Sequence, residues 1–280
     1  MRSGRSWRRS TVARPLADFL ELGALTIALL LLAAFVAGWV DAVVGGGGLI
    51  QLPALLIGLP NTTPPADILG TNKVSSVWGT ATSSLTYAIR VRPDWRTIIP
   101  LVAASAAGSA GGAQLAHFLP KEWFTPIVLA ALVGVGIYTW RRPELGLVSA
   151  RKHDGGAHYG RTAVIGLGVG AYDGFLGPGT GSFFVILLVG VLGYGFLEAS
   201  AKAKIANLVT NLSAIAVFAA SGSVLWVLGL AMGAANLVGG LLGGRTAISR
   251  GNAFIRRVFL MVLAGLVLRL SYDLVRQLTS

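Results

Sequence analysis

Long apolar runs separated by short polar connectors make up most of the chain. Most of these runs approach the roughly twenty residues that an α-helix needs to cross a bilayer, and two are too short to cross alone. In the first half the apolar runs cover residues 22–44, 49–59, 67–89, 95–118 and 123–140. In the second half they cover residues 162–176, 182–192, 198–220, 224–248 and 254–278. The pattern predicts an all-α integral membrane protein.

Each half is interrupted at the same place by a glycine-rich break. Residues 45–48 are four consecutive glycines, and residues 177–181 read Gly-Pro-Gly-Thr-Gly. Glycine and proline disrupt helices, so each break separates a long run from the short run after it. We therefore predict that each half consists of a broken helix, folded as a re-entrant element, followed by three spanning helices.

The two halves also match residue by residue, which a shared hydropathy profile alone would not produce. Asp41 and Gly45 recur as Asp173 and Gly177, both at an offset of 132 positions. A second set follows at an offset of 131 positions: Lys73 with Lys204, Trp95 with Trp226, Gly108 with Gly239 and Gly112 with Gly243. These matches predict two pseudo-symmetric repeats. The expected organisation is a basic N-terminal tail at residues 1–21, a first transmembrane repeat at 22–140, a polar linker at 141–161 and a second transmembrane repeat at 162–280.

Composition supports a membrane protein and excludes other classes. Hydrophobic residues make up 54% of the chain, charged residues only 12%, and the mean hydropathy is +0.71, whereas about 25% of residues are charged in a typical soluble domain. The net charge of +12 does not indicate nucleic-acid binding, because the basic residues lie in connectors between apolar runs, as in cytoplasmic loops. The absence of cysteine excludes disulfides and thiolate metal sites.

Loop charge bears on the relative orientation of the halves. Arg90 and Arg92 lie between the third and fourth segments of the first half, whereas the matching residues 221–223 carry no charge. The loop that contains Arg245 and Arg250 matches a nearly neutral loop of the first half. Basic loops at opposite places predict inverted repeats. The basic N-terminal tail does not fit inverted repeats, because this arrangement places the tail outside the cell. The alternative is two parallel halves with four spanning segments each. A cleaved signal peptide is disfavoured because the first apolar run is too long for a signal core.

The glycine-rich breaks are the first candidates for a binding site. They lack the lysine of a nucleotide-binding loop and lie between apolar runs, so nucleotide binding is not expected. A helix that begins inside the bilayer directs backbone N–H groups and a positive dipole end at mid-depth, where an anion can bind. The alternative is tight helix packing at the glycines. The candidate substrate-binding residues in the breaks are Gly47, Gly48, Gly179, Thr180 and Gly181.

Two matched lysines are the second candidates. Lys73 and Lys204 lie well inside apolar segments, where a lysine costs about 2.5–3.5 kcal/mol on insertion scales. No acidic residue lies one helical turn from either of them, so a bound anion is expected to compensate their charge. The alternative is that each lysine reaches the membrane surface. Neighbouring hydroxyl and amide groups that could also bind the anion are Thr71, Asn72, Ser76, Asn207 and Asn211.

Two matched aspartates complete the set of candidates. Asp41 and Asp173 each precede a glycine break, where a carboxylate could take up a proton during coupled transport. Capping of the broken helix is the alternative role. The histidines, including His158 in the predicted linker, have no metal-ligand spacing, so neither a metal site nor another cofactor is expected. No arrangement of residues indicates an enzyme.

The motifs around the first break and the first lysine resemble those of the TauE/SafE family, also called toluene-sulfonate uptake permeases. They are residues 37–49 (AGWVDAVVGGGGL), residues 69–74 (LGTNKV) with Tyr87, residues 94–96 (DWR), and the second glycine break at Gly177. The resemblance covers about residues 33–270. It implies secondary, ion-coupled carriers of sulfite, organosulfonates and related small anions, built from inverted repeats and often dimeric.

We therefore expect a multi-pass protein of the cell membrane that carries a small anion, with sulfite or organosulfonates as the expected substrates, by ion-coupled alternating access. The expected partners are the anionic substrate, the lipid bilayer and, in some assemblies, a second copy of the chain. An anion channel shares the same features, although two broken elements favour an occluded site over an open pore. A membrane-embedded enzyme is the less favoured alternative, because no nucleophile and base are placed together.

Overall fold

The computed structural model describes residues 22–60, 62–92, 94–118, 149–150 and 155–279, and contains no strand in these residues. The prediction of an all-α protein is therefore confirmed for this part of the chain. The helices are α2 (Ala24–Val44), α3 (Gly48–Gly58), α4 (Pro65–Arg90), α5 (Trp95–Leu115), the short 3₁₀ helix η1 (Ala116–Phe118), α7 (Gly155–Phe175), α8 (Thr180–Leu192), α9 (Phe196–Ala220) and α10 (Trp226–Thr279). The span predicted at residues 123–140 lies outside the described residues.

The observed helices follow the predicted runs closely, with two differences. Helix α7 begins at Gly155, inside the segment that the sequence assigns to a polar linker. Helix α10 combines the last two predicted runs, which meet at Gly251, a residue with non-helical backbone angles of φ 70 and ψ −168. Both glycine breaks are present, between α2 and α3 and between α7 and α8.

Four helices among the described residues are long and apolar enough to cross a membrane. They are Ala24–Val44, Trp95–Leu115, Phe196–Ala220 and the Trp226–Met261 part of α10. Two shorter apolar helices, Gly48–Gly58 and Thr180–Leu192, are those that follow the glycine breaks. Helix α4 has 26 residues but is less apolar, because its buried face carries Asn72, Lys73 and several hydroxyl side chains. The polar groups of this bundle therefore face inward, as they must in a bilayer.

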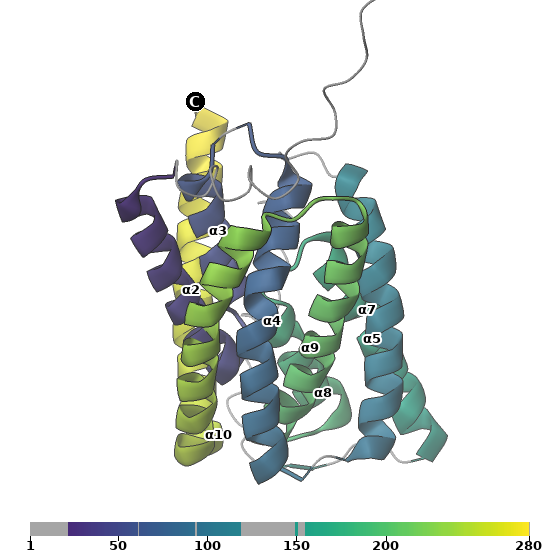
Figure 1. Cartoon of the computed structure of the whole chain (residues 1–280). Coiled ribbons are helices and arrows are strands. Elements are labelled where there is room, and N and C mark those ends of the chain that lie inside the picture. The colour runs from purple at the N-terminus through teal and green to yellow at the C-terminus, as the bar shows by residue number, and fades with distance from the viewer. Residues whose placement is uncertain (1–21, 61, 93, 119–148, 151–154, 280) are drawn as a thin grey trace, which may run out of the picture.

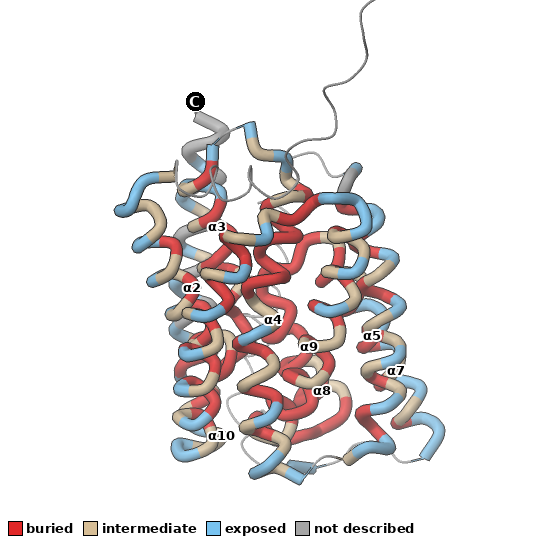
Figure 2. Tube along the Cα trace, viewed as in Figure 1, coloured by how far each residue is buried: buried red, intermediate tan, exposed pale blue. Residues whose placement is uncertain are grey.

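The helices form an upright bundle with α2 toward one side, α4 and α9 in the middle and α7 toward the other side (Figure 1). The α2–α3 hairpin opens toward the end of the bundle where the C-terminus lies, and the α7–α8 hairpin opens toward the opposite end. Helices α4 and α9 lie side by side and run in opposite directions: Thr71 contacts Leu225 beyond the end of α9, whereas Thr80 contacts Asn211 inside it. Figure 2 shows that buried residues concentrate along this central region.

The tips of the two hairpins touch each other. The Ser182 backbone N–H donates to the Gly45 carbonyl at 2.9 Å, and the Ser182 hydroxyl donates to the Val44 carbonyl at 3.1 Å. Gly45 has a φ of 85, which favours glycine, and a Cβ on it would overlap the backbone of Gly181. The glycine breaks therefore allow two backbones to meet at a distance that side chains would prevent.

Each hairpin also packs closely against a long helix from the other half. Gly108 and Gly112 of α5 lie so near α7 that a Cβ on either would overlap a backbone carbonyl, that of Leu167 or Ala171. Gly239 and Gly243 of α10 lie equally near α2, against the carbonyls of Phe35 and Trp39. Glycines four residues apart are the usual device for close helix contact in membranes. The close packing of α5 on α7, and of α10 on α2, therefore depends on these glycines.

Replacing Gly112 with alanine should destabilise the protein, since the added methyl group meets the α7 backbone. The neighbouring Gly111 is the matched control, because a Cβ there has no atom within 4 Å. We expect Gly112→Ala to lower the free energy of unfolding by about 1–3 kcal/mol, the usual cost of overpacking, and Gly111→Ala to be neutral or slightly stabilising. Thermal unfolding of the purified proteins in detergent measures both. Equal effects of the two substitutions would contradict the close packing of α5 on α7.

Candidate functional site

A small enclosed cavity lies where the two hairpin tips meet. The volume that the centre of a water-sized sphere can reach is ≈ 20 Å³, which is room for about one water molecule. Six helices (α2, α3, α4, α7, α8 and α9) and both glycine breaks contribute to its wall. The lining residues are Asp41, Gly45, Gly48, Asn72, Lys73, Ser76, Asp173, Gly177, Gly179, Thr180, Gly181, Asn207 and Asn211.

This wall contains most of the residues that the sequence identifies as candidates. Both aspartates, Lys73 and eight of the other predicted residues converge here from segments more than 100 residues apart in sequence. Several lining residues are related by the internal repeat: Asp41 with Asp173, Gly45 with Gly177, Gly48 with Thr180 and Ser76 with Asn207. Three candidates do not line the cavity, namely Gly47, Thr71 and Lys204.

These three residues make structural contacts instead. Gly47 lies against α2, where a Cβ would approach the Cβ of Asp41 to 2.7 Å. The Thr71 hydroxyl donates to the Asp67 carbonyl at 2.6 Å and accepts the Leu225 backbone N–H at 2.9 Å. Lys204 is fully buried and donates to Asp41, through both the backbone carbonyl and Oδ2.

The two lysines matched by the repeat, Lys73 and Lys204, are paired with the two matched aspartates, each across the boundary between the halves. Lys73 Nζ lies 2.6 Å from Asp173 Oδ2, and Lys204 Nζ lies 3.1 Å from Asp41 Oδ2. The side chains of Lys73, Asp173 and Lys204 are at most 3% exposed, and that of Asp41 is 15% exposed. The expectation that a bound anion must compensate both lysines is therefore wrong. It considered carboxylates one turn away in sequence, whereas the partners come from the opposite repeat.

A buried network of amide side chains supports the cavity and was not predicted. The Asn236 side-chain amide donates to Gln51 Oε1 at 3.0 Å and to the Ala34 carbonyl at 2.9 Å, and Gln51 Nε2 donates to the Asn72 carbonyl at 3.3 Å. On the other side of the site, Asn211 Nδ2 donates to Thr80 Oγ1 at 3.2 Å. Gln51 follows a break and Asn236 interrupts an apolar run, but neither has a repeat partner of the same kind to draw attention to it.

His158 also differs from the expectation, because it is a buried residue of α7 and not part of a linker. Its Nε2 lies 3.0 Å from Thr97 Oγ1 and 3.1 Å from the Tyr194 hydroxyl, and Lys202 Nζ lies 4.1 Å from the centroid of the Tyr194 ring. This cluster joins the starts of α5, α7 and α9. Among the described residues, no group of three or more His, Asp or Glu side chains could hold a metal ion.

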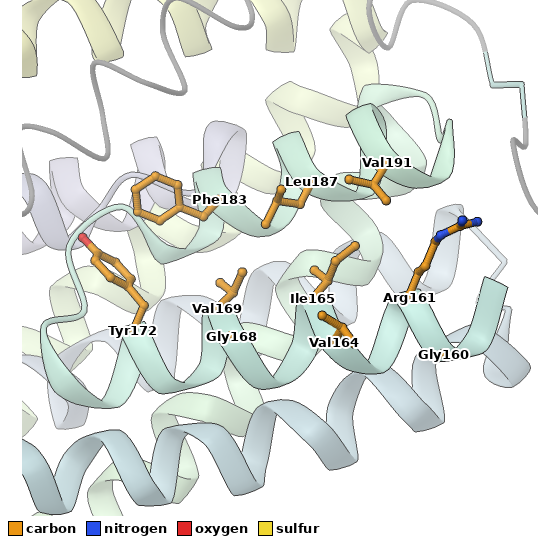
Figure 3. A pocket seen from close by; sticks show the side chains of 10 residues that line it. All are labelled: Gly160, Arg161, Val164, Ile165, Gly168, Val169, Tyr172, Phe183, Leu187 and Val191. Atoms are coloured by element: carbon orange, nitrogen blue, oxygen red, sulfur yellow. The ribbon is translucent and has the colours of Figure 1, made fainter. Parts of the chain in front are cut away.

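A second, larger space lies between α7 and α8 and, unlike the charged cavity, has a mostly apolar wall (Figure 3). This groove has a volume of ≈ 690 Å³, and its wall is apolar except for Arg161 at one end and Tyr172 at the other. Val164, which lines it, is 72% exposed. The Tyr172 hydroxyl donates to the Pro178 carbonyl at 2.6 Å, so the inner end of the groove touches the second break. Such a wall suits contact with lipid chains and not the binding of a small anion.

Apolar helices that enclose a charged cavity, formed where two interrupted helices meet, are the architecture of a multi-pass membrane transporter. The comparison with known families agrees with this class. The family described as "Sulfite exporter TauE/SafE" matches residues 30–270 of this chain. The protein therefore belongs to the TauE/SafE family of membrane transporters, as the sequence motifs indicated.

Individual relatives carry only general names. The chain is 36% identical over 247 residues to "Probable membrane transporter protein ORF9" of Sinorhizobium sp, covering 88% of this chain and 93% of that protein. It is 32% identical over 258 residues to a "Probable membrane transporter protein" of Haemophilus influenzae, with 91% and 98% covered. It is 31% identical over 255 residues to YfcA of Escherichia coli K12, another "Probable membrane transporter protein", with 89% and 91% covered. No solved structure matches the chain.

Pairing across the halves predicts strong coupling between Lys73 and Asp173. Lys73→Gln or Asp173→Asn alone leaves one buried charge unpaired and should lower the free energy of unfolding by about 3–5 kcal/mol. The double substitution removes both charges and should recover most of that loss. A double-mutant cycle from thermal unfolding in detergent measures the coupling. Strictly additive losses would show that the two charges do not stabilise each other.

Proposed function

We propose that this transporter carries small anions, with sulfite and organosulfonates as the substrate class, by ion-coupled alternating access. The observation that carries the proposal is a buried cavity in which a lysine, several amide and hydroxyl groups and the N-terminal end of α8 converge at the middle of an apolar bundle. Hydrogen-bond donors and a helix N-terminus bind the oxygens of an anion. The family description, which names sulfite, supports the same class of substrate.

The directions of the helices support an inverted relation between the two repeats. The α2–α3 and α7–α8 hairpins open toward opposite ends of the bundle, and α4 and α9, which occupy equivalent places, are antiparallel (Figure 1). The loops with Arg92 and Arg250 lie at one end, because α10 runs alongside α4 in the same direction, with Gly229 beside Val74 and Gly244 beside Thr86. In this proposal the basic end is cytoplasmic.

The size of the cavity supports an occluded site and not an open pore. A sulfite or sulfonate group is larger than the ≈ 20 Å³ enclosed here, so binding requires the hairpin tips to separate. The contact of Ser182 with Gly45 and Val44 is then the closure that opens. A hairpin that moves away from its partner exposes the site to one side only, which is alternating access. In an anion channel the site would instead be open to both sides of the membrane at the same time.

Charge balance supports coupling to a proton through the aspartates. The four buried charges at the site are two lysines and two aspartates, so the site is neutral before an anion enters. A monoanion would leave one buried negative charge uncompensated, which is costly in a low-dielectric interior. Uptake of one proton by Asp41 or Asp173 restores neutrality, and the joint movement of anion and proton transfers no net charge.

Assembly as a homodimer stays a prediction.

The inverted arrangement predicts which loops are reached from outside the cell. Because the chain has no cysteine, single cysteines can be introduced at Arg92 and Arg250 without background. Neither should react with an impermeant thiol reagent added outside intact cells. Cysteines at the exposed Thr62 and Ser221, at the other end of the bundle, should react and serve as the positive control. Labelling at Arg92→Cys or Arg250→Cys from outside would rule out the inverted arrangement.

The proposed function predicts saturable uptake of radiolabelled sulfite into proteoliposomes, with competition by organosulfonates. Lys73→Gln should abolish this uptake, because Lys73 is the one lysine among the described residues that line the cavity. The folded Lys73→Gln, Asp173→Asn double variant should be inactive as well, which separates loss of binding from loss of folding. A linear dependence on sulfite concentration would indicate a channel instead. Unchanged half-saturation in either variant would place the anion site elsewhere.

A further inference from the structure

The two ion pairs are related by the internal repeat, yet only one of them faces the cavity. Lys73 and Asp173 both line its wall. In the other pair Asp41 lines the wall but Lys204 lies behind it, fully buried. An anion in the cavity can therefore reach the ammonium group of Lys73 directly, whereas that of Lys204 is screened by its own counter-ion.

The pair formed by Lys204 is also held more firmly. Lys204 Nζ donates to Asp41 Oδ2 and to the Asp41 backbone carbonyl, close to the C-terminal end of α2, where the helix dipole favours a cation. The same carbonyl accepts the Gly45 N–H at 2.7 Å, so this lysine is bonded to the residue that orients the hairpin tip. The Tyr87 hydroxyl fixes the next carbonyl, that of Ala42, at 3.1 Å.

The pair formed by Lys73 has fewer connections. Among the described residues Lys73 Nζ contacts Asp173 Oδ2, and no hydrogen-bond donor is aligned on that oxygen in addition to the ion pair. The repeat equivalent of Tyr87 in the second half is Phe218, which has no hydroxyl group and cannot donate a hydrogen bond to the tip of the α7–α8 hairpin. Asn72, which precedes Lys73 and also lines the cavity, has a buried Oδ1 without a hydrogen-bond partner in the described part of the chain. Its repeat equivalent is Ala203.

We propose that the ion pair of Lys73 and Asp173 opens and re-forms during the transport cycle, whereas the ion pair of Lys204 and Asp41 stays formed throughout it. The inference rests on the proposed anion transport and assigns different roles to the two halves of the site. One substrate anion replaces the Asp173 carboxylate at Lys73, and Asp173 takes up one proton in the same step, so charge is conserved. Lys204 is then a positioning residue: it acts through Asp41 to hold the tip of α2 against α9.

The groups that surround Asp173 are compatible with this exchange. The titratable side chains near it are Lys73 on α4, Asp41 on α2, Lys204 on α9 and Tyr172 on α7 itself. Helix α5, which packs against α7 here, brings Ser109 near Gly174 and no titratable group among the described residues of this contact. Once Lys73 binds the substrate, no other cation in this set is free for Asp173, because Lys204 already holds Asp41.

The repeat supplies matched variants for the test. Uptake of radiolabelled sulfite is measured in proteoliposomes with and without an imposed inward proton gradient, for wild type, Asp173→Asn and Asp41→Asn. The gradient should stimulate wild type and Asp41→Asn, although Asp41→Asn is slower and less heat-stable. In Asp173→Asn the stimulation should be lost while exchange of internal for external sulfite persists, which also shows that the variant is folded. Because all three proteins meet the same pH step, protonation of sulfite itself cancels from the comparison.

Two further pairs keep the test decisive if a neutral variant does not fold. Asp173→Glu should shift the external pH at which uptake is half-maximal, and Asp41→Glu should not. Lys73→Arg should alter the half-saturation concentration, whereas Lys204→Arg should alter the maximal rate. Loss of the gradient effect in Asp41→Asn but not in Asp173→Asn would overturn the assignment, as would equal effects of the two substitutions. Absence of saturable sulfite uptake in wild type would overturn the proposed function itself.

Discussion

The central constraint on this protein is that the two matched lysines, Lys73 and Lys204, each have their counter-charge in the opposite half of the chain. Lys73 on α4 is paired with Asp173 on α7, and Lys204 on α9 is paired with Asp41 on α2. In a bilayer an isolated lysine or aspartate at this depth is costly, so the pairs can exist only when the two hairpin tips lie between α4 and α9. The contact of Gly45 with Ser182 and the small cavity beside it follow from that placement.

Close helix packing makes this placement possible. The tips meet because both breaks are glycine-rich, and the hairpins reach the centre because α5 and α10 offer glycine surfaces to α7 and α2. These contacts join helices of different repeats, so the two halves interlock and do not stand side by side as separate domains. Dispersion between closely packed backbones is the main attraction available inside a bilayer, where burial of apolar surface adds little.

Much of the fold could be predicted from the sequence, because hydropathy and glycine breaks act locally. The apolar runs, both breaks and the residue-level repeat identify the helices to within a few residues, except that α7 begins at Gly155 and not after residue 161. The repeat also identified the charged residues of the site, since Asp and Lys recur at matched places in otherwise apolar segments. The matching of Asp41 with Asp173, and of Ser76 with Asn207, is reproduced in the cavity wall.

The partners of these residues could not be predicted, because pairing depends on how the halves pack. Sequence distance placed no carboxylate near Lys73, although one lies 2.6 Å away. The same limit applies to Gln51 and Asn236, whose hydrogen bond joins α3 to α10. Pseudo-symmetry was also misleading at Lys204, which the repeat makes equivalent to Lys73 but which packing removes from the cavity wall.

Interlocking of the halves has a consequence for how the chain is made. Lys73 precedes Asp173 by 100 residues in the chain (173 − 73), so during synthesis Lys73 enters the bilayer before Asp173 exists to pair with it. During that interval the lysine carries an uncompensated insertion cost of about 2.5–3.5 kcal/mol, and the α2–α3 hairpin has no partner for its tip. The pair of Lys73 therefore forms only after α7 has been made, and the pair of Asp41 only after α9 has been made.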